Sequence, residues 1–526
     1  MKNILNRKNL FTTQSLALLL IIAGILIAIN LISANHFGRL DLTADKQYSI
    51  SQATKNTVKN LNDLLTIKVY FSSKLPPDLV QTQQYLKDIL SEYQAYSKNV
   101  RIEFIDPAKD SQTKEEVQNL GIPEIEMQIL DKDEFKVQKG YLGLALFYAD
   151  KKEIIPIIQN TQNLEYDLTS AIKRLTAESL KSLAFLAGQN EHGIFSTPYD
   201  SEEQAQLNDY TEVAKALNKN YRVTTINLAE NEKLDNIDTL IIAGPQKELS
   251  AKELYQIDQF IIKSGKVIFL IDPVRIIQPM QTVSNETGLE KLLNNYGIQV
   301  NQNLVIDTIN ENVGFSSGYM QFFLPYPFWP KLIKENFLKD HPIVAKLQSI
   351  SLPWVSSLAE NPKEGVELKI LATTSANGAT MNFPINLDPQ QNFNPTEQKK
   401  IPIIIEAKAK FKSAYADQEI PEGTEGPKIR QAEKESQIIV LANSNFINDD
   451  YIKRFPDNLV FFQNAVDYLT LDSDLINIRS KALTDRPLKK LSDNAKTWIK
   501  VINIGLIPLL VIIFGIVRFY LRKRNK

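Results

Sequence analysis

The chain has 526 residues, so it exceeds one typical hydrophobic core and we expect more than one domain. Its 60 basic and 61 acidic residues give a formal net charge of −1, which excludes a global field that would draw it onto nucleic acid or anionic lipid. It contains no cysteine, which excludes disulfides, thiolate metal sites and a cysteine nucleophile.

The first predicted element is an apolar segment over residues 11–34, after a basic tail over residues 1–10. Its uncharged run from Phe11 to Ile32 is long enough to cross about 30 Å of hydrocarbon as a helix. The alternative is a cleaved signal peptide. That reading needs a shorter apolar region and a better cleavage site than "NLISANHF" offers. We therefore expect a transmembrane helix.

Residues 35–65 form a predicted juxtamembrane collar and helix. Ser49 with Gln52 three residues on makes a capping-box pattern ahead of a mostly apolar stripe. The simpler interpretation is that this is only the first capped helix of the body. The candidate interface residues of the collar are Arg39, Asp41, Leu42, Thr43, Tyr48 and Ser49.

Residues 66–180 predict a small α/β domain. A strand at Ile67–Phe71 precedes a helix at Asp78–Tyr96, and the strands "VRIEFIDP", "EIEMQIL" and "GYLGLALFYAD" precede a helix at Leu164–Leu175. The order strand, helix, strand, two strands, helix is that of a thioredoxin-like domain. Without cysteines only the scaffold could be kept.

Residues 181–475 predict a second α/β domain. "SLAFLAG", "IDTLIIAGP" and "GKVIFLIDP" read as buried strands, and helices are expected at Glu203–Leu217, Ala251–Ile262 and Asn458–Leu469. This alternation favours a doubly wound parallel sheet. The pattern is lost around 310–436, apart from one strand-like run, "KIPIIIEAKAKF", and we interpret this stretch as an insertion or an elaborated flank of the domain.

The chain ends in a predicted return linker at 476–498, a second transmembrane helix at 499–518 and a basic tail at 519–526. A buried core helix is the alternative for 499–518. Because both terminal tails are basic, we expect both to lie in the cytoplasm and the body outside it. The candidate residues for packing this span closely against a partner helix are Gly505, Pro508 and Gly515.

Several catalytic motifs are absent from the sequence. Gly265-Lys266 is followed by Val267 and belongs to no Walker A loop, so the chain has no ATPase site of that kind. No cofactor-binding motif or metal-ligand spacing is present, and the three histidines are isolated in the sequence.

The loop "GQNEHG" is the candidate ligand loop, with Gly188, Glu191 and His192 as its candidate residues. It follows the first strand of the second domain, at the edge where open α/β sheets bind ligands. Glu191 and His192 could form an acid/base pair. The simpler interpretation is a strand-to-helix turn whose polar residues face water. Aspartates also follow predicted strands at Asp106, Asp272 and Asp307, where turn chemistry is favoured over a metal cluster.

The segments "GRLDLTADKQYSISQAT", "VYFSSKLPPDL", "LEYDLTSAIKRL" and "NLVFFQNAVDYL" together resemble the GldG-like accessory subunits of ABC transporters, in the same order along nearly the whole chain. The resemblance implies a second domain similar to the intraflagellar-transport and glutamine amidotransferase-like module, without the nucleophilic cysteine of those enzymes. The GldG-like family often has a compact Gly-His-Gly-Glu-type turn where this sequence has "GQNEHG".

The resemblance implies a non-enzymatic subunit of the bacterial inner membrane. Its expected partners are a separate permease, a separate ATPase and an envelope protein or glycan, with gliding motility as one known setting of the family. Two other classes remain open. One is a membrane-anchored envelope hydrolase that uses Glu191 and His192, and the other is a structural scaffold of surface machinery.

Overall fold

The computed structural model describes residues 49–471, apart from short gaps at 132–133, 159–160, 162–163, 178, 196–208, 231, 278–279, 318–319, 346, 394, 396 and 425, together with 18–19, 21–25, 500, 502, 512–521 and 523. The chain divides into two compact units, 1–483 and 484–526. In the second unit, residues 512–521 are helical. Among the residues described, no helix has both the length and the apolar character needed to cross a membrane.

The predicted spans at 11–34 and 499–518 lie mostly outside the described residues, as do the collar residues Arg39, Asp41, Leu42, Thr43 and Tyr48, the linker at 476–498, and Gly505 and Pro508. Gly515 is described, and a Cβ atom added there would meet no other atom within 4 Å.

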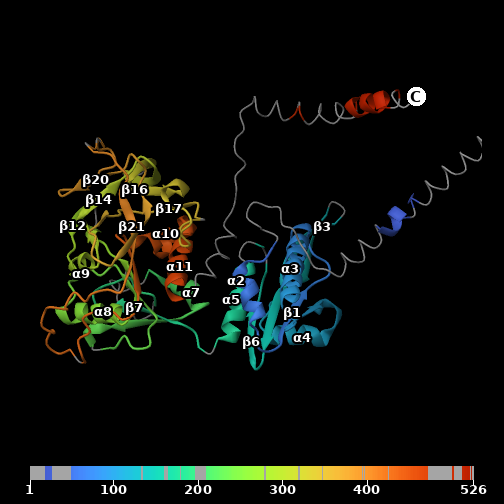
Figure 1. Ribbon diagram of the computed structural model, residues 1–526, viewed down its shortest axis with the longest axis horizontal. Coiled ribbons are helices and arrows are strands. Elements are labelled where there is room, and N and C mark those ends of the chain that lie inside the picture. The colour runs from blue at the N-terminus through green and yellow to red at the C-terminus, as the bar shows by residue number, and fades with distance from the viewer. Residues whose placement is uncertain are drawn as a thin grey trace, which may run out of the picture. The chain divides into compact units, whose positions relative to one another are not determined.

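The first α/β domain is built on a four-stranded sheet in the order β2-β1-β5-β6 (Figure 1). β2 runs parallel to β1, whereas β5 is antiparallel to both β1 and β6. The strand predicted at "EIEMQIL" is β3, which pairs with β4 in a separate hairpin. The elements are α2 (Gln52–Lys59), β1 (Leu65–Phe71), α3 (Pro77–Tyr96), β2 (Val100–Ile105), α4 (Ser111–Asn119), β3 (Ile125–Asp131), β4 (Glu134–Gly140), β5 (Leu142–Tyr148), β6 (Lys151–Ile155) and α5 (Leu164–Thr176).

The cap of α2 differs from the predicted one. The side chain of Ser51, not of Ser49, accepts the hydrogen bond from the backbone N–H of Thr54. Ser51 has the extended backbone of an N-cap residue, and its own N–H donates to Glu165 on α5 at 2.6 Å. The predicted capping box is therefore wrong by two residues, because the tertiary contact with α5 fixes where the helix begins.

The second α/β domain is built on a seven-stranded sheet in the order β19-β21-β22-β10-β9-β7-β8. Its five strands from β22 to β8 are mutually parallel. The chain runs from β7 outward to β8, then returns to β9 on the other side of β7, so the sheet is doubly wound. The elements that form and cover it are β7 (Ser182–Ala187), α7 (Thr211–Asn218), β8 (Arg222–Asn227), β9 (Thr239–Ala243), α8 (Ala251–Ile262), β10 (Lys266–Leu270), α9 (Leu289–Asn295), β22 (Ser436–Leu441), α10 (Asp449–Arg454) and α11 (Pro456–Thr470).

Both faces of this sheet are buried. Along β7, Leu183 and Phe185 pack into one hydrophobic cluster, together with side chains from α7 and α11. The alternating residues Ala184 and Leu186 pack into a second cluster with side chains from α8 and α9. Burial on both faces explains why the parallel strands are continuous apolar runs in the sequence.

The segment 310–436 is not a separate insertion. Its strands β19 (Glu367–Thr373) and β21 (Pro402–Ala409) extend the main sheet, with β21 antiparallel to β22. The remaining strands of the second domain form small sheets. These strands are β11 (Val274–Ile277), β12 (Gln281–Ser284), β13 (Ile298–Val300), β14 (Asn303–Ile306), β15 (Asn310–Ser317), β16 (Met320–Ile333), β17 (Ser349–Ser351), β18 (Leu358–Glu360) and β20 (Ala379–Asn382). The small sheets that include β11, β14, β15, β16 and β20 contribute to a further cluster rich in aromatic side chains.

The polar loop that begins near Ser413 is fastened to α8. The carboxylate of Asp258 accepts hydrogen bonds from the Ser413 hydroxyl at 2.6 Å and from the Ala414 N–H at 2.8 Å. The neighbouring Gln259 pairs with the backbone of Ile429 through both its amide oxygen and its amide nitrogen. Two adjacent helix residues therefore hold both ends of this loop.

Candidate functional site

The candidate site lies where four parallel strands of the main sheet end. Gly188, Gly244, Asp272 and Ser444 come within three residues after β7, β9, β10 and β22 respectively. β7 and β9 are also the pair at which the winding of the sheet reverses. In doubly wound sheets this switch point is the usual place for a functional site.

His192 is the centre of the site, and its side chain is 9% exposed. Its Nδ1 atom lies 2.7 Å from Oδ1 of Asp209, and its Nε2 atom lies 2.8 Å from Oγ of Ser444. The imidazole ring stacks on Tyr210, with 4.6 Å between ring centroids and 6° between planes. Hydrogen bonds at both nitrogens and the stacked ring fix the orientation of the imidazole.

Ser444 links His192 to a second carboxylate. Its hydroxyl donates to Oδ2 of Asp272, and its backbone N–H donates to Oδ1 of the same residue at 2.8 Å. The backbone carbonyl of Ser444 accepts a hydrogen bond from the Tyr210 hydroxyl. Because a hydroxyl has only one proton to donate, Ser444 accepts at its oxygen from Nε2–H of His192. In this arrangement both nitrogens of the ring are placed to donate, which is the hydrogen bonding of a protonated imidazole.

The electrostatics agree with a charged ring. Burial by itself would lower the pKa of His192, but the hydrogen bond that its ring donates to Asp209 and the charges of Asp209, Asp272 and Glu191 outweigh burial and raise it. Burial raises the pKa of Asp272, against the hydrogen bonds from Ser444 and the charge of His192. The site is therefore a hydrogen-bonded network in which the imidazole of His192 contacts Asp209 directly and Asp272 through Ser444.

Glu191 makes no hydrogen bond to His192 among the described residues, so the structure does not support the acid/base alternative. The favoured interpretation, a turn whose polar residues face water, is wrong too, since both side chains are buried. The Oε2 atom of Glu191 accepts from the backbone N–H of Gln189 at 2.7 Å, within its own loop. Its other oxygen is buried without a hydrogen-bond partner among the described residues. Burial raises the pKa of Glu191. The Glu191 side chain therefore stabilises its own loop, and Asp209 is the carboxylate that contacts the imidazole of His192.

Two glycines let the loops approach this closely. Gly244 has φ +66°, and a Cβ atom there would lie 2.5 Å from Oγ of Ser444 and 2.9 Å from the ring of His192. Gly188 has φ +118°, and a Cβ atom there would lie 2.6 Å from Oδ1 of Asn227. Both positions need glycine for its backbone freedom and for the space it leaves.

The arrangement contains the residue types of a Ser-His-Asp triad, but its hydrogen bonds run in the other direction. A triad serine donates to the imidazole, which removes its proton. Here Ser444 donates to Asp272 and is 0% exposed, so the hydroxyl has neither a free base nor access to a substrate. Within the described ranges, no three histidine, aspartate or glutamate side chains could hold a metal ion.

Sequence reasoning found His192 but missed Asp209 and Ser444. It favoured a turn for Asp272, which instead accepts hydrogen bonds from Ser444. Ser444 carried a usable signal, since it lies three residues past a strongly apolar strand. Asp209 had none, because it lies in a polar stretch between two elements. The other strand-end aspartates make turns, as the sequence favoured. Asp106 accepts from the N–H of Ala108, and Asp307 accepts from the N–H of Ile309.

The topology and the site define the second domain as a doubly wound α/β module with a buried polar network at its switch point. Its residues 180–470 match the profile of the family described as an ABC-type uncharacterized transport system, and residues 44–146 match a domain of unknown function. The chain belongs to this ABC-type transport family. The family assigns it an accessory role in an ABC transport system.

Three known proteins are similar to the chain. A Borreliella burgdorferi protein, described as uncharacterized, is 27% identical over 506 residues, covering 93% of this chain and 94% of its own. The mmIFT52 N-terminal domain aligns at 16% identity and a TM-score of 0.34, over 55% of this chain and 97% of its own. The exo-beta-1,4-mannosidase Op5Man5 of Opitutaceae bacterium strain TAV5 aligns at 8% identity and a TM-score of 0.26, over 75% of this chain and 50% of its own.

Proposed function

We propose that the chain is a non-enzymatic, membrane-anchored subunit of an ABC transporter complex in the bacterial inner membrane. A separate permease moves the substrate and a separate ATPase supplies the energy, while the α/β body binds the substrate or an envelope partner. The observation that carries this proposal is the family match over residues 180–470. The lack of a Walker A sequence in the chain supports the assignment of ATP hydrolysis to another subunit.

The membrane placement is supported by exposed apolar side chains in helical residues near both ends of the chain. Such side chains are unfavourable in water and favourable in hydrocarbon. Basic residues at both termini favour a cytoplasmic position for both tails, with the body on the other side. The exposed side chains are Leu18, Leu19, Ile21, Ile22, Ile25, Ile512, Ile513, Phe514, Ile516, Val517, Phe519 and Leu521.

The non-enzymatic role is supported by the state of the polar network. The hydroxyl, the backbone N–H and the carbonyl of Ser444 each have a partner among Asp272, His192 and Tyr210. A buried polar network whose groups are hydrogen-bonded stabilises the place where several loops meet. This role is structural and fits a subunit that binds a partner without catalysing a reaction.

The experiment that tests the proposal is purification of the tagged full-length protein from native membranes in a mild detergent, followed by mass spectrometry of the proteins that come with it. We expect an ABC permease and an ATPase in stoichiometric amounts. Recovery of the protein alone, or together with cell-wall enzymes, would contradict the proposal.

The second candidate function is a hydrolase, because Ser444, His192 and Asp209 are the residue types of a triad and lie in contact, although the Ser444 hydroxyl donates to Asp272. A hydrolase of this kind reacts at serine with a fluorophosphonate probe. Labelling of the wild-type protein that is lost in S444A would establish the hydrolase and overturn the non-enzymatic role. We expect no labelling of either protein, with a known serine hydrolase in the same sample as the positive control.

A further inference from the structure

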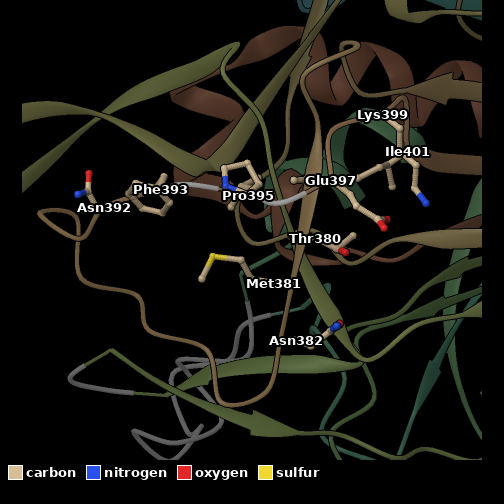
Figure 2. A pocket seen from close by; sticks show the side chains of 11 residues that line it. Thr380, Met381, Asn382, Asn392, Phe393, Pro395, Glu397, Lys399 and Ile401 are labelled. Carbon is tan, nitrogen blue, oxygen red and sulfur yellow. The ribbon is translucent and has the colours of Figure 1, made fainter.

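A pocket of about 350 Å³ lies between strand β20 and the segment 392–401. It is remote in the sequence from the His192 network, and it borders the aromatic cluster of the small sheets. Figure 2 shows Asn392 and Phe393 at one end and Lys399 and Ile401 at the other. The volume is that of a site for a small organic molecule.

Hydrogen bonds hold both walls of the pocket in place. The N–H of Lys399 donates to the carbonyl of Gly378 at 2.8 Å, and the N–H of Ile401 donates to the Thr374 hydroxyl at 2.9 Å. Further back in the chain, the Tyr326 hydroxyl donates to the carbonyl of Leu387 at 2.8 Å. The segment is therefore held at Lys399 and Ile401, and the chain that leads into it is held at Leu387.

One wall is aromatic. Phe393 packs edge-on against Phe328, with 5.6 Å between the ring centroids, and is only partly buried. Ile306 and Ala379, both buried, complete the apolar floor beneath it. Phe393 thus keeps part of its ring surface for a ligand.

Five polar side chains line the pocket. Within the part of the chain that the structure describes, none of the five makes a side-chain hydrogen bond or an ion pair with another residue. Side chains that converge on a cavity with their donors and acceptors unused can serve a ligand. They are Thr380, Asn382, Asn392, Glu397 and Lys399.

These side chains select a neutral ligand. Glu397 and Lys399 are the only charged residues among those that line the pocket, and their charges are opposite. The asparagines and the threonine supply both donors and acceptors. A ring bearing several hydroxyl groups matches this mixture, because each hydroxyl can donate and accept while a C–H face packs on an aromatic ring. We propose that the pocket binds a small neutral saccharide.

The test uses the full-length protein in a detergent without a sugar headgroup, since a maltoside would compete. Maltose, cellobiose and N-acetylglucosamine are titrated separately at up to millimolar concentration, and binding is followed by saturation-transfer NMR. We expect saturable binding of at least one sugar, weakened about tenfold or more in E397Q and in N382A. The side chains of both residues are exposed, so neither change should unfold the protein.

The matched control is E364Q, which makes the same change at an exposed glutamate outside the pocket and should bind as the wild type does. If none of the three sugars binds, or if the pocket variants bind equally well, the proposal is overturned. Binding of a neutral tripeptide in place of the sugars would also overturn it. The inference stands on the pocket alone, so saccharide binding by a chain that co-purifies with no permease would uphold it while contradicting the transporter role.

Discussion

The Nε2 atom of His192 lies 2.8 Å from the Oγ atom of Ser444, although the two residues are 252 positions apart in the chain. Asp209 holds the other nitrogen of the ring, and Asp272 holds the serine hydroxyl. Three separate stretches of chain, following β7, β10 and β22, are thereby joined at one edge of the sheet. We expect this network to stabilise the fold, and each of its side chains can be tested by a single substitution.

Replacing Ser444 with alanine should lower the free energy of unfolding by about 1–3 kcal/mol. The change removes the hydroxyl that bridges His192 and Asp272 and leaves a buried carboxylate short of one donor. Urea denaturation of the purified protein would measure the loss. The matched control is S356A, because the Ser356 hydroxyl is buried without a partner among the described residues. S356A should cost little, and an equal loss in both variants would contradict the role of the network.

The effect of His192 on stability should depend on pH. Because its pKa is raised above the ordinary value of 6.5, the folded protein binds the proton more tightly than the unfolded chain does. The stabilisation is then fully present below about pH 6.5 and is lost as the pH rises through the folded-state pKa. The destabilisation caused by H192Q should therefore shrink with rising pH, by up to about 1.4 kcal/mol per unit. Urea denaturation of both proteins between about pH 6 and pH 9 would show it, and a constant difference would refute it.

Substituting Gly244 with alanine should destabilise the protein more than the same change at Gly365. Both glycines have positive φ, +66° and +74°, so the backbone strain is similar. An added methyl group at Gly244 would meet the Ser444 hydroxyl and the His192 ring, whereas at Gly365 it would meet nothing within 4 Å. The expected excess is about 1–3 kcal/mol, read from thermal or urea unfolding. Equal losses of stability in the two variants would contradict this prediction, because they would show that the added methyl group at Gly244 does not disturb the network.

Asp258 should be among the most sensitive residues of the second domain. Its buried carboxylate accepts from the hydroxyls of Tyr296 and Ser413 and from the Ala414 N–H. We expect D258A to cost about 3 kcal/mol or more and to open the loop that begins near Ser413 to proteases. D417N is the control, since Asp417 pairs with Lys412 at an exposed position and should change stability by no more than about 0.5 kcal/mol.

Regular elements were predictable from periodicity and composition. The helix predicted over 251–262 is α8 at Ala251–Ile262, and the one predicted over 164–175 is α5 at Leu164–Thr176. In both, apolar residues recur at helical spacing beside recognisable polar residues. The alternation of helices and apolar strands likewise indicated a mixed α/β protein with a parallel sheet, which the strand pairing contains.

The predictions that failed depended on contacts between distant parts of the chain. Ser49 has the right spacing for a cap, but the contact of Ser51 with Glu165 decides where α2 begins. Glu191 adjoins His192 in the sequence, yet Asp209 lies against the imidazole. β21 was predicted from the apolar run "KIPIIIEAKAKF", whereas β19 was missed because its residues lie among long polar loops. Local patterns contain no information about which distant residue a side chain meets.

The order of strands in the main sheet has a consequence for how the protein is made. β22, the last strand of the sheet in the sequence, lies between β10 and β21, in its interior. Until residue 441 has left the ribosome, β10 and β21 have no strand between them, and their edges stay open. The second domain therefore completes its core only after β22 has been made, and the nascent domain would need protection from aggregation until then.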